Sequence, residues 1–586
     1  MKDMGDLDRL LRRLDGKGYG AGKQVIGRYA AQDLLLWFTY APADRFAPPG
    51  RLIVEIGTRE YGYPPEVLSS EARRTCVAHY ISHLVNRMLR DSGLDLVRID
   101  SPGQVVLART SVHVEEDGIQ LRLGFHFEAA GRRILGRRCA DAYCQVLPEI
   151  VRSTAYEKIR KDDLDDLIRC VENQRAIRRS LPELGLVGFV GDGSVLPRNG
   201  NTDLPMETGA IPFEAPESLE VSMSRPHGED VRGLGIPGGK LTCISGANFQ
   251  GKTTLLEALG QGMYDHVPGD GRELVVCVQD LAFANKENRR IVSDTDITPF
   301  IRELPGVGDC SRFSSSSSSG STSQAACIID CVEAGVPGIL VDEDDSAVNL
   351  LVKDSRLRRL VPGDVEPIRP LIDTIKSLPR EHGLTPIMVV GALGEFTEIA
   401  DMIIMMHEFR VEDATDRISE FRNDPTVELM KEVAERLPDD VRARLGDAKE
   451  EARREQLHGL SFGDVRNRVP RSTEMRGRIK VRHQGRDEIV ISVNRRKIVI
   501  DLRGDIQKTL VEGSQVSALG DAVVHATRFM DGRRSLAEVV GTVMEDVSRN
   551  GLDCLSRFDT PGQRDYAEFT PYQLFYCLSR FPDLVT

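Results

Sequence analysis

A glycine-rich stretch in the middle of the chain, SGANFQGKTTLLEAL (245–259), constrains the fold most strongly. Gly246, Gly251, Lys252 and Thr253 match the spacing G-x-x-x-x-G-K-[ST], which is typical of a loop that wraps phosphate groups. The apolar segment KLTCIS precedes this loop and the helical pattern TTLLEAL follows it. The stretch therefore predicts a strand–loop–helix unit of an α/β fold, whereas a chance glycine-rich turn would not require both flanking elements.

Each part of this motif has a chemical role. The glycines let backbone N–H groups point toward phosphate oxygens, and the N-terminus of the following helix adds partial positive charge. Lys252 would neutralise β- and γ-phosphate oxygens, and Thr253 would offer its hydroxyl to Mg²⁺. We therefore expect ATP or ADP with Mg²⁺ to bind here, and Lys252 to take part in catalysis. The expected binding residues are Gly246, Ala247, Asn248, Phe249, Gln250, Gly251, Lys252, Thr253 and Thr254.

A second motif, GILVDEDDSAVN (338–349), predicts a buried strand that ends in acids. Asp342, at the end of the apolar run, could reach the Mg²⁺ held by Thr253. Glu343 could orient and deprotonate an attacking water molecule, so we expect it to be catalytic. Two acids after a strand can also be ordinary surface residues, but the phosphate loop upstream favours the catalytic interpretation.

A serine-rich stretch, FSSSSSSGSTSQAA (313–326), has the composition of a flexible linker. Residues 320–324 nevertheless lead into a helical pattern, SQAACIIDCVEAG, which favours a helix start there. A linker remains the alternative for residues 314–318.

The acidic motif resembles the ABC-ATPase pattern D-E-P-T-S-A-L-D without a gap. In that pattern a Ser-Gly-Gly signature precedes the first acid by about twenty residues, and Ser319, Gly320 and Ser321 stand at this distance here. The resemblance implies that these three residues contact the nucleotide of a second subunit. The chain would then work as a homodimer, with the phosphate loop of one subunit facing the signature loop of the other.

Nearly the whole chain is similar to one family, the soluble "predicted ATPases of the ABC class". A eukaryotic member of this family is an RNA-binding ATPase accessory to trypanosome mitochondrial mRNA editing. The resemblance implies RNA binding, a larger RNA-processing complex and a mitochondrial location. It rests on PGQVVLARTSV (102–112), LVGFVGDGSVLPRNGNTDLP (186–205), YDHVPGDGRE (264–273), DITPFI (296–301), SGSTSQAA (319–326), VDEDDSA (341–347) and EPIRPLID (366–373).

Departures from the family pattern affect the catalytic residues. Gln250 replaces the usual histidine, and residues 391–394 (GALG) stand where an ABC transporter ATPase has a switch histidine. The second change would slow hydrolysis more than it would weaken nucleotide binding. Gln279, at the end of a predicted strand, could sense Mg²⁺, and Glu287 is the competing candidate.

The 586 residues suggest several domains. Strand-like and helical runs in residues 1–205 predict an α+β domain. Apolar runs in 206–412, namely KLTCISG, ELVVCVQD, GILVDED and TPIMVVG, predict the mainly parallel sheet of an ABC-type P-loop NTPase, the fold class to which we assign the chain. Residues 413–586 predict a second α+β domain, with a strand pair in RDEIVISVNRRKIVIDL.

Charge is distributed unevenly along the chain. The net charge is −13, yet residues 466–497 hold 11 Lys and Arg against 3 acids. Such a segment can bind RNA phosphates, and a solvated basic hairpin is the alternative. The residues that we single out for RNA are Arg476, Arg478, Lys480, Arg482, Arg495, Arg496 and Lys497.

Two function classes follow. In the first, ATP-driven closure of the homodimer gates RNA binding. In the second, the chain is an ATP-dependent switch or scaffold for other proteins. No apolar run reaches the length of a membrane-spanning helix, so we expect a soluble protein. The 11 scattered cysteines indicate reduced core thiols.

Overall fold

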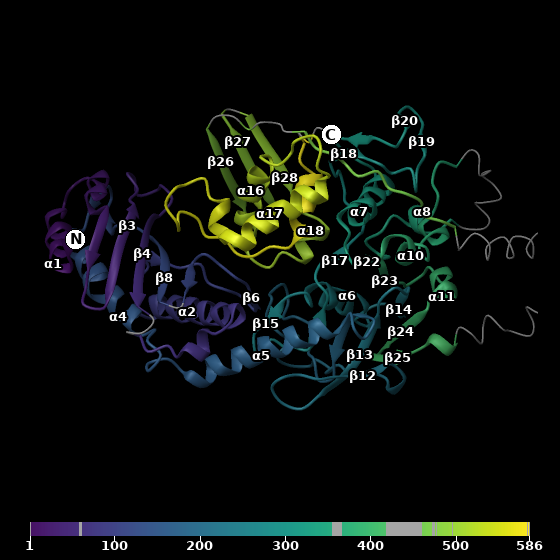
Figure 1. Cartoon of the computed structure of the whole chain (residues 1–586), viewed down its shortest axis with the longest axis horizontal. Coiled ribbons are helices and arrows are strands. Elements are labelled where there is room, and N and C mark those ends of the chain that lie inside the picture. The colour runs from purple at the N-terminus through teal and green to yellow at the C-terminus, as the bar shows by residue number, and fades with distance from the viewer. Residues whose placement is uncertain are drawn as a thin grey trace, which may run out of the picture.

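The computed structural model describes residues 2–57, 61–115, 117–353, 366–417, 460–471, 475, 478–494, 496–582, 584 and 586. Figure 1 shows an N-terminal region at one end, a central region at the other, and a C-terminal region above and between them. The C-terminal region contacts both neighbours. On the N-terminal side, for example, the Glu568 N–H donates to the Ala108 carbonyl at 2.8 Å.

A seven-stranded sheet organises the N-terminal region, in the order β1-β2-β3-β4-β8-β5, with β7 also paired to β8. Alternating residues Leu34, Leu36 and Phe38 of one strand are buried, so one face of the sheet meets the helices. The strands are β1 (Lys2–Asp3), β2 (Gly27–Ala30), β3 (Leu34–Tyr40), β4 (Gly50–Gly57), β5 (Val97–Arg98), β7 (Val112–Val114) and β8 (Gly118–Phe125), and the helices are α1 (Met4–Arg13), α2 (Glu71–Asp91), α3 (Gly136–Asp141), α4 (Leu147–Arg152) and α5 (Lys161–Ser180).

A six-stranded sheet forms the core of the central region, in the order β17-β22-β23-β14-β24-β25. All its pairs are parallel except the last, β24–β25. Helices α6 (Lys252–Gln261) and α7 (Gly320–Ala334) connect strands of this sheet. The strands are β14 (Thr242–Gly246), β17 (Leu281–Phe283), β22 (Gly338–Asp342), β23 (Thr385–Val389), β24 (Met402–His407) and β25 (Arg410–Asp413).

A second, four-stranded sheet corrects one predicted strand. We expected ELVVCVQD (273–280) in the parallel sheet, but β16 (Val275–Cys277) pairs antiparallel with β11 (Leu186–Gly191). The parallel neighbour of β22 is instead β17. An apolar run signals burial but does not reveal which sheet a strand joins. β13 (Val231–Pro237) and β12 (Glu220–Met223) complete the sheet, so β11, which we had included in residues 1–205, hydrogen-bonds with central strands.

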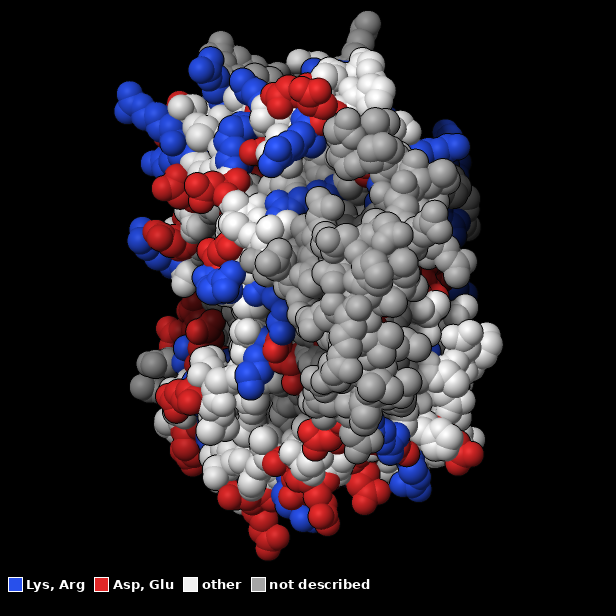
Figure 2. Space-filling view, turned by 90° about the vertical axis from the view of Figure 1, so that its right-hand side faces the viewer, with Lys and Arg blue, Asp and Glu red and all other residues white. Residues whose placement is uncertain are grey.

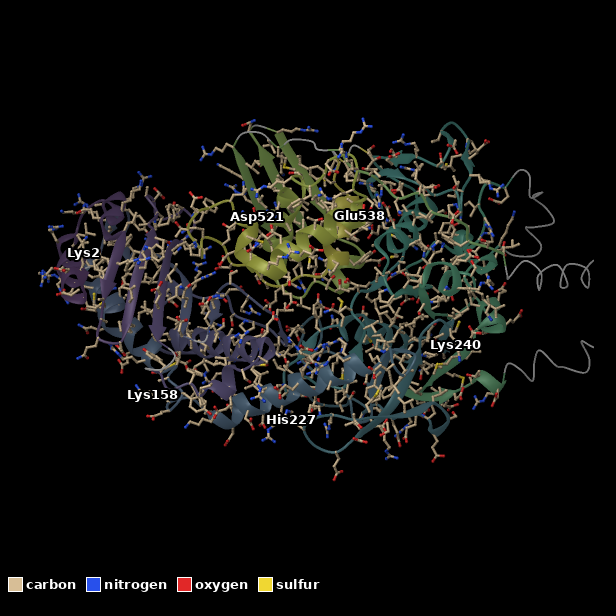
Figure 3. The ribbon with its side chains drawn as sticks, viewed as in Figure 1. Lys2, Lys158, His227, Lys240, Asp521 and Glu538 are labelled. Atoms are coloured by element: carbon tan, nitrogen blue, oxygen red, sulfur yellow. The ribbon has the colours of Figure 1, made fainter. Side chains whose placement is uncertain are left out.

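The C-terminal region combines an antiparallel sheet with helices, as the sequence predicts. The sheet contains β26 (Ile479–Gln484), β27 (Glu488–Val493) and β28 (Arg496–Asp501), and the helices are α16 (Gly513–Ala526), α17 (Leu536–Asn550) and α18 (Pro571–Ser579). Asp521 of α16, labelled in Figure 3, is buried and accepts the Tyr566 hydroxyl at 2.8 Å.

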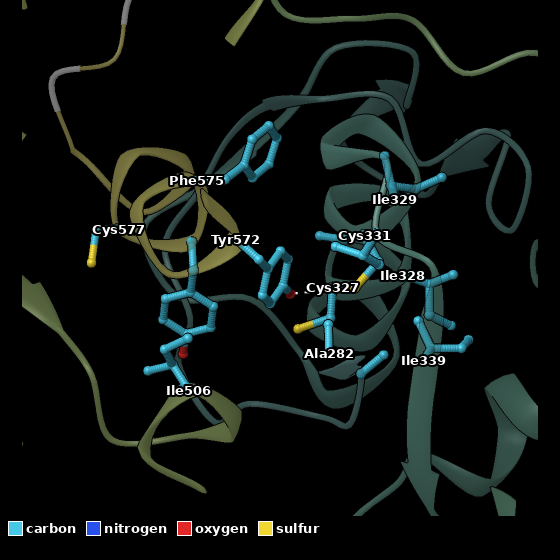
Figure 4. Packing of buried hydrophobic residues seen from close by; sticks show 14 of the residues in the cluster. Ala282, Cys327, Ile328, Ile329, Cys331, Ile339, Ile506, Tyr572, Phe575 and Cys577 are labelled. Atoms are coloured by element: carbon cyan, nitrogen blue, oxygen red, sulfur yellow. Dashed lines mark hydrogen bonds between the residues drawn. The ribbon is translucent and has the colours of Figure 1, made fainter. Parts of the chain in front are cut away.

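The C-terminal region shares its core with the central region. Figure 4 shows Tyr572 and Phe575 of α18 packed against α7, and the Tyr572 hydroxyl lies 3.3 Å from the Cys331 sulfur. Ile506 of a 3₁₀ turn, η6 (Asp505–Lys508), is buried in the same cluster. The predicted fold, a mainly parallel α/β centre between two α+β regions, is confirmed.

Within the described residues, no helix is both long and apolar enough to cross a membrane. All eleven cysteines are free, and most are buried.

Candidate nucleotide-binding site

The loop between β14 and α6 has the backbone conformation that its glycines permit. Gly246 and Gly251 have φ angles of 131° and 94°, which side-chain-bearing residues rarely adopt. A Cβ atom at Gly246 would also lie 2.3 Å from the Met406 carbonyl oxygen. The loop therefore depends on glycine at both positions that define the motif.

Lys252 lies inside this loop rather than in solvent. Its ammonium donates to the carbonyl oxygens of Gly246 and Ala247, both at 2.8 Å. The residue is only 8% exposed. Because a charged phosphate oxygen is a stronger acceptor than these carbonyls, a phosphate group bound in the loop would replace them as partner of the ammonium.

Thr253 and Asp342 come together where a metal ion would bind. The Thr253 hydroxyl donates to the Asp342 carboxylate at 2.8 Å. Burial raises the pKa of Asp342, although the hydrogen bond from Thr253 lowers it in part. A cation would favour the ionised carboxylate, so the hydroxyl and the carboxylate fit the hard oxygen ligands that Mg²⁺ prefers.

Glu343 points to the loop after β23, where the sequence lacks a switch histidine. Its carboxylate accepts the backbone N–H groups of Gly391 at 2.7 Å, Ala392 at 3.0 Å and Leu393 at 3.2 Å. At this position of the chain, three backbone N–H groups therefore bond to the carboxylate, and no imidazole is present in residues 391–394.

Ser319, Gly320 and Ser321 lie at the start of α7. Ser319 is the N-cap, and its hydroxyl accepts the Thr322 N–H. The Ser321 hydroxyl donates to Asn349 at 2.9 Å, which joins the predicted signature to the loop after Asp342. Among the described residues, no hydrogen bond joins residues 319–321 to residues 246–254 of the same chain.

The linker interpretation of residues 314–318 is wrong. β21 (Phe313–Ser315) pairs with β18 (Val292–Thr295). Ser318 is buried, and its hydroxyl donates to the Arg290 carbonyl at 2.8 Å. Serine composition resembles that of a linker, but here the Ser314 hydroxyl accepts the Asp294 N–H of β18, and the Ser318 hydroxyl bonds just before that strand.

The structure separates Gln279 from the metal site, contrary to our expectation. Gln279 precedes β17, and β17 runs parallel to β22 with Leu281 level with Gly338. At about 3.3 Å per residue, the level of Leu281 lies about 13 Å along β22 from Asp342, and Gln279 lies in the turn before Leu281. The error has the same cause as the wrong strand assignment. If ELVVCVQD (273–280) were the parallel neighbour of β22, Gln279 would lie at its carboxyl end, close to Asp342.

The competing candidate, Glu287, is bound to residues of the C-terminal region and makes no hydrogen bond to Thr253 or Asp342 among the described residues. It is buried and bonds to Arg580 at 2.7 Å and to the Tyr576 hydroxyl at 2.6 Å. Burial opposes its ionisation, but the charges of Arg580 and Arg290 lower its pKa below the ordinary value. Glu287 therefore joins the central region to α18.

Sequence reasoning missed Asn285, which lies two residues after β17, the true parallel neighbour of β22. Its side-chain oxygen accepts the Asp342 N–H at 2.8 Å. It also missed the turn between β24 and β25, where the Glu408 N–H donates to Gln250 at 2.5 Å. Phe249 in the phosphate loop and Phe409 in this turn both have positive φ angles and exposed rings, and Phe249 is 94% exposed.

Part of the predicted basic surface lies on one face of the C-terminal sheet. Lys480 and Lys497 both stand opposite Ser492, so they share the face turned away from buried Val481. Arg482 belongs to this face by strand alternation, while Arg496 stands opposite Val493 and faces the other way. Arg478 is exposed just before β26, and Arg476 and Arg495 lie outside the described residues.

The face of the molecule that Figure 2 shows lies at the end formed by the central region, and it carries charges of both signs. Figure 2 shows that acidic side chains gather toward the lower edge of the face in view, while Lys and Arg are mixed with acids above. A broad positive field is therefore not a feature of that face.

Three family models match consecutive parts of the chain. A model described as "ATPase of the ABC class N-terminal" matches residues 4–158. The P-loop domain of ABC ATPases matches residues 160–443, and the "MRB1590 C-terminal domain" matches residues 480–586.

One curated protein is similar to part of the chain. The uncharacterised protein MJ1628 of Methanocaldococcus jannaschii is 34% identical over 250 residues, which cover 41% of this chain and 54% of that protein. The chain therefore matches about half the length of this curated relative.

Two solved structures match part of the chain. cbiO1 from Clostridium perfringens, part of the ABC transporter complex cbiONQ, is 15% identical with a TM-score of 0.26 and covers 45% of this chain and 99% of its own. An inward-facing, putative metal-chelate type ABC transporter is 14% identical with a TM-score of 0.25, covering 39% and 82%. On the three consecutive family matches, the chain belongs to the ATPases of the ABC class.

Proposed function

We propose that the chain binds and hydrolyses ATP as a homodimer, and that nucleotide-driven closure of this dimer gates RNA binding. The observation that carries the proposal is the contact between Thr253 and Asp342 at 2.8 Å beside a phosphate loop that holds Lys252. Glu343 follows Asp342 directly and supplies a carboxylate next to the same site.

Different residues of the site bind the phosphates, activate the water molecule and hold the metal ion. Lys252 exchanges its carbonyl partners for phosphate oxygens, and the N-terminus of α6 contributes partial positive charge. Glu343 orients a water molecule and takes its proton on the carboxylate. When bound by Thr253 and Asp342, Mg²⁺ supplies charge neutralisation to the phosphates. Gly391 to Leu393 offer backbone donors in place of histidine, so we expect slow turnover.

Exposed groups around the site support a homodimer. Phe249 is 94% exposed at the tip of the phosphate loop, and Val348, beside the signature, is 53% exposed. Single exposed apolar residues are common, but these two lie on the two loops that would meet in a sandwich of two subunits. Pairing would bury both and bring Ser319–Ser321 to the nucleotide of the partner.

RNA binding is supported by Lys480, Arg482 and Lys497, which share an exposed face. Each phosphate contact would add salt-dependent affinity. The family resemblance extends the proposal to a larger RNA-processing complex, and to mitochondrial RNA editing.

The test uses the variant Glu343→Gln, with ATP and Mg²⁺, and measures mass and RNA retention together. We expect a dimer with ATP that retains RNA, a monomer without nucleotide, and neither dimer nor RNA retention in Lys252→Ala. Replacing Lys480, Arg482 and Lys497 with Glu should abolish RNA retention and leave the dimer intact. The matched control replaces Arg132, Arg133 and Arg137, another exposed basic cluster, with Glu.

The second candidate is an ATP-dependent switch for proteins. It is favoured by the net charge of −13, which disfavours RNA outside the basic face. An ATP-dependent dimer that retains no more RNA than an unrelated acidic protein would support this candidate.

A further inference from the structure

The C-terminal region reaches the metal site through Asn285, which makes two hydrogen bonds to Asp505 and one to Asp342. Asp505, the first residue of η6, accepts the Asn285 backbone N–H at 2.6 Å and the Asn285 side-chain amide at 2.8 Å. The side-chain oxygen of Asn285 accepts the Asp342 N–H at 2.8 Å. Asp505 lies 220 residues from Asn285 in the chain, so this contact depends on docking of the C-terminal region.

Each member of the series is buried. Asn285 is 1% exposed, Asp342 is 2% exposed and Asp505 is 6% exposed. The Asn285 amide has one orientation that satisfies both neighbours, because its oxygen must face the Asp342 N–H and its nitrogen must face Asp505. A buried polar group left without a partner at any of these positions would destabilise the site, so the arrangement is strongly specified.

The turn that carries Asp505 is held firmly. The Lys508 ammonium lies 2.6 Å from the Asp345 carboxylate and 4.9 Å from the Phe283 ring centroid. The Gln261 amide at the end of α6 donates to the Lys508 carbonyl at 3.3 Å. η6 therefore touches the strand, the helix and the acidic loop that surround the site.

We propose that Asp505 is a positioning residue of the metal site, which fixes the Asn285 amide so that Asn285 holds Asp342 in place for Mg²⁺. This inference rests on the proposed function. Asn285 and Asp505 act through Asp342 and are not ligands themselves. The completed metal site thus requires a residue from outside the P-loop domain.

The chemistry of the pair suggests a reciprocal exchange. In Asp505→Asn, an amide nitrogen faces one of the two Asn285 donors, so one hydrogen bond is lost. In Asn285→Asp, two carboxylates face each other. In the double variant, the new carboxylate at position 285 accepts from both the Asp342 N–H and the new amide at position 505. The oxygen of that amide accepts the backbone N–H at position 285. All three hydrogen bonds are then restored, and donor and acceptor are exchanged only in the bond between the two side chains.

The experiment measures equilibrium binding of a fluorescent ATP analogue to the full chain across a Mg²⁺ titration, at pH 8. Burial, with nearby Glu287, raises the pKa of Asp505 to about 6, so its carboxylate is ionised at this pH. Both single variants should raise the half-saturating Mg²⁺ concentration about 10-fold, as substitutions behind metal ligands do. Nucleotide affinity in EDTA should stay at the wild-type value, and the double variant should return to within about 2-fold of the wild-type Mg²⁺ requirement.

Controls separate the possible outcomes. Asp501→Asn removes an exposed acid of β28 and should leave the Mg²⁺ requirement unchanged. If Asp505→Asn does not fold, Asp505→Glu replaces it in the experiment. This variant keeps the charge but displaces the carboxylate, and it should also raise the half-saturating Mg²⁺ concentration. A wild-type chain that binds no nucleotide overturns the proposed function. If the wild-type chain binds nucleotide and every folded variant has the same half-saturating Mg²⁺ concentration as the wild type, this inference alone is overturned. It is also overturned if the double variant requires as much Mg²⁺ as the single variants.

Discussion

The carboxylate of Glu343 accepts the backbone N–H of Gly391, with 2.7 Å between Oε2 and the nitrogen. Ala392 and Leu393 donate to the same carboxylate, so the loop after β23 holds the side chain from three directions. A backbone donor has no pKa near neutrality and cannot exchange a proton with substrate as histidine can. The loop therefore orients Glu343 without sharing its proton chemistry.

The variant Ala392→Pro tests this role, because proline removes one N–H donor. We expect kcat for ATP hydrolysis to fall about 10-fold with nucleotide affinity unchanged, since the carboxylate loses orientation but the phosphate loop is untouched. Ala392→Gly, which keeps the donor, is the control. An increase in kcat would mean instead that the loop restrains Glu343.

A buried ion network joins α7 to the C-terminal region, and Arg468 lies at its centre. Arg468 is 0% exposed, and its guanidinium bonds to Asp330 at 2.6 Å and to Glu333 at 2.8 Å. Arg468→Met leaves these two carboxylates without one partner and should lower the free energy of unfolding by about 3–5 kcal/mol. Urea denaturation measures the loss. Arg503→Met, which breaks an exposed pair with Asp501, should cost less than about 1 kcal/mol.

Phe249 provides a test of the dimer. Phe249→Ser removes an exposed ring but keeps a Cβ at the same left-handed φ of 63°. If pairing buries the ring, its loss costs about 1.5–3 kcal/mol, and the dimer formed by the Glu343→Gln variant with ATP should weaken at least 10-fold in sedimentation equilibrium. Phe46→Ser removes a ring that is 88% exposed in the N-terminal region. Equal dimer affinity for both variants would contradict the placement of Phe249 in the interface.

Asp280 should make stability depend on pH. Burial raises its pKa to about 6, and its Oδ1 is buried without a hydrogen-bond partner among the described residues. An acid with a raised folded-state pKa stabilises the fold below its unfolded pKa, and this contribution is lost as pH rises through about 6. Relative to Asp280→Asn, the wild type should therefore lose about 1–2 kcal/mol between pH 4.5 and 8. Parallel pH profiles in thermal or urea unfolding would refute this.

The sequence predicts the phosphate loop, Asp342 and Glu343 because each motif is local. Glycines, lysine and threonine stand within eight residues, and the strand before them is a continuous apolar run. The structure brings Thr253 and Asp342 together because β14 and β22 both flank β23 and run in one direction. Motif spacing and strand direction are enough for this part of the site.

Other parts depend on contacts that no local pattern encodes. β16 and β17 are separated by only three residues, and both are apolar, so the sequence did not distinguish the antiparallel strand from the parallel one. Asn285 was missed because its role is set by Asp505, far along the chain. The serine stretch was ambiguous because the partner strand that orders it is also distant in sequence.

The buried ion network also has a mechanical consequence. Asp330 and Glu333 belong to α7, whose N-cap is the signature residue Ser319. Arg468 forms ion pairs with both acids, and Arg580, just after α18, forms one with Asp330. Moving α7 away from α18 would leave these charges unpaired in the protein interior, so we expect the two helices to move together. A shift of Ser319 would then be transmitted to the C-terminal region, which also carries the strand surface with Lys480.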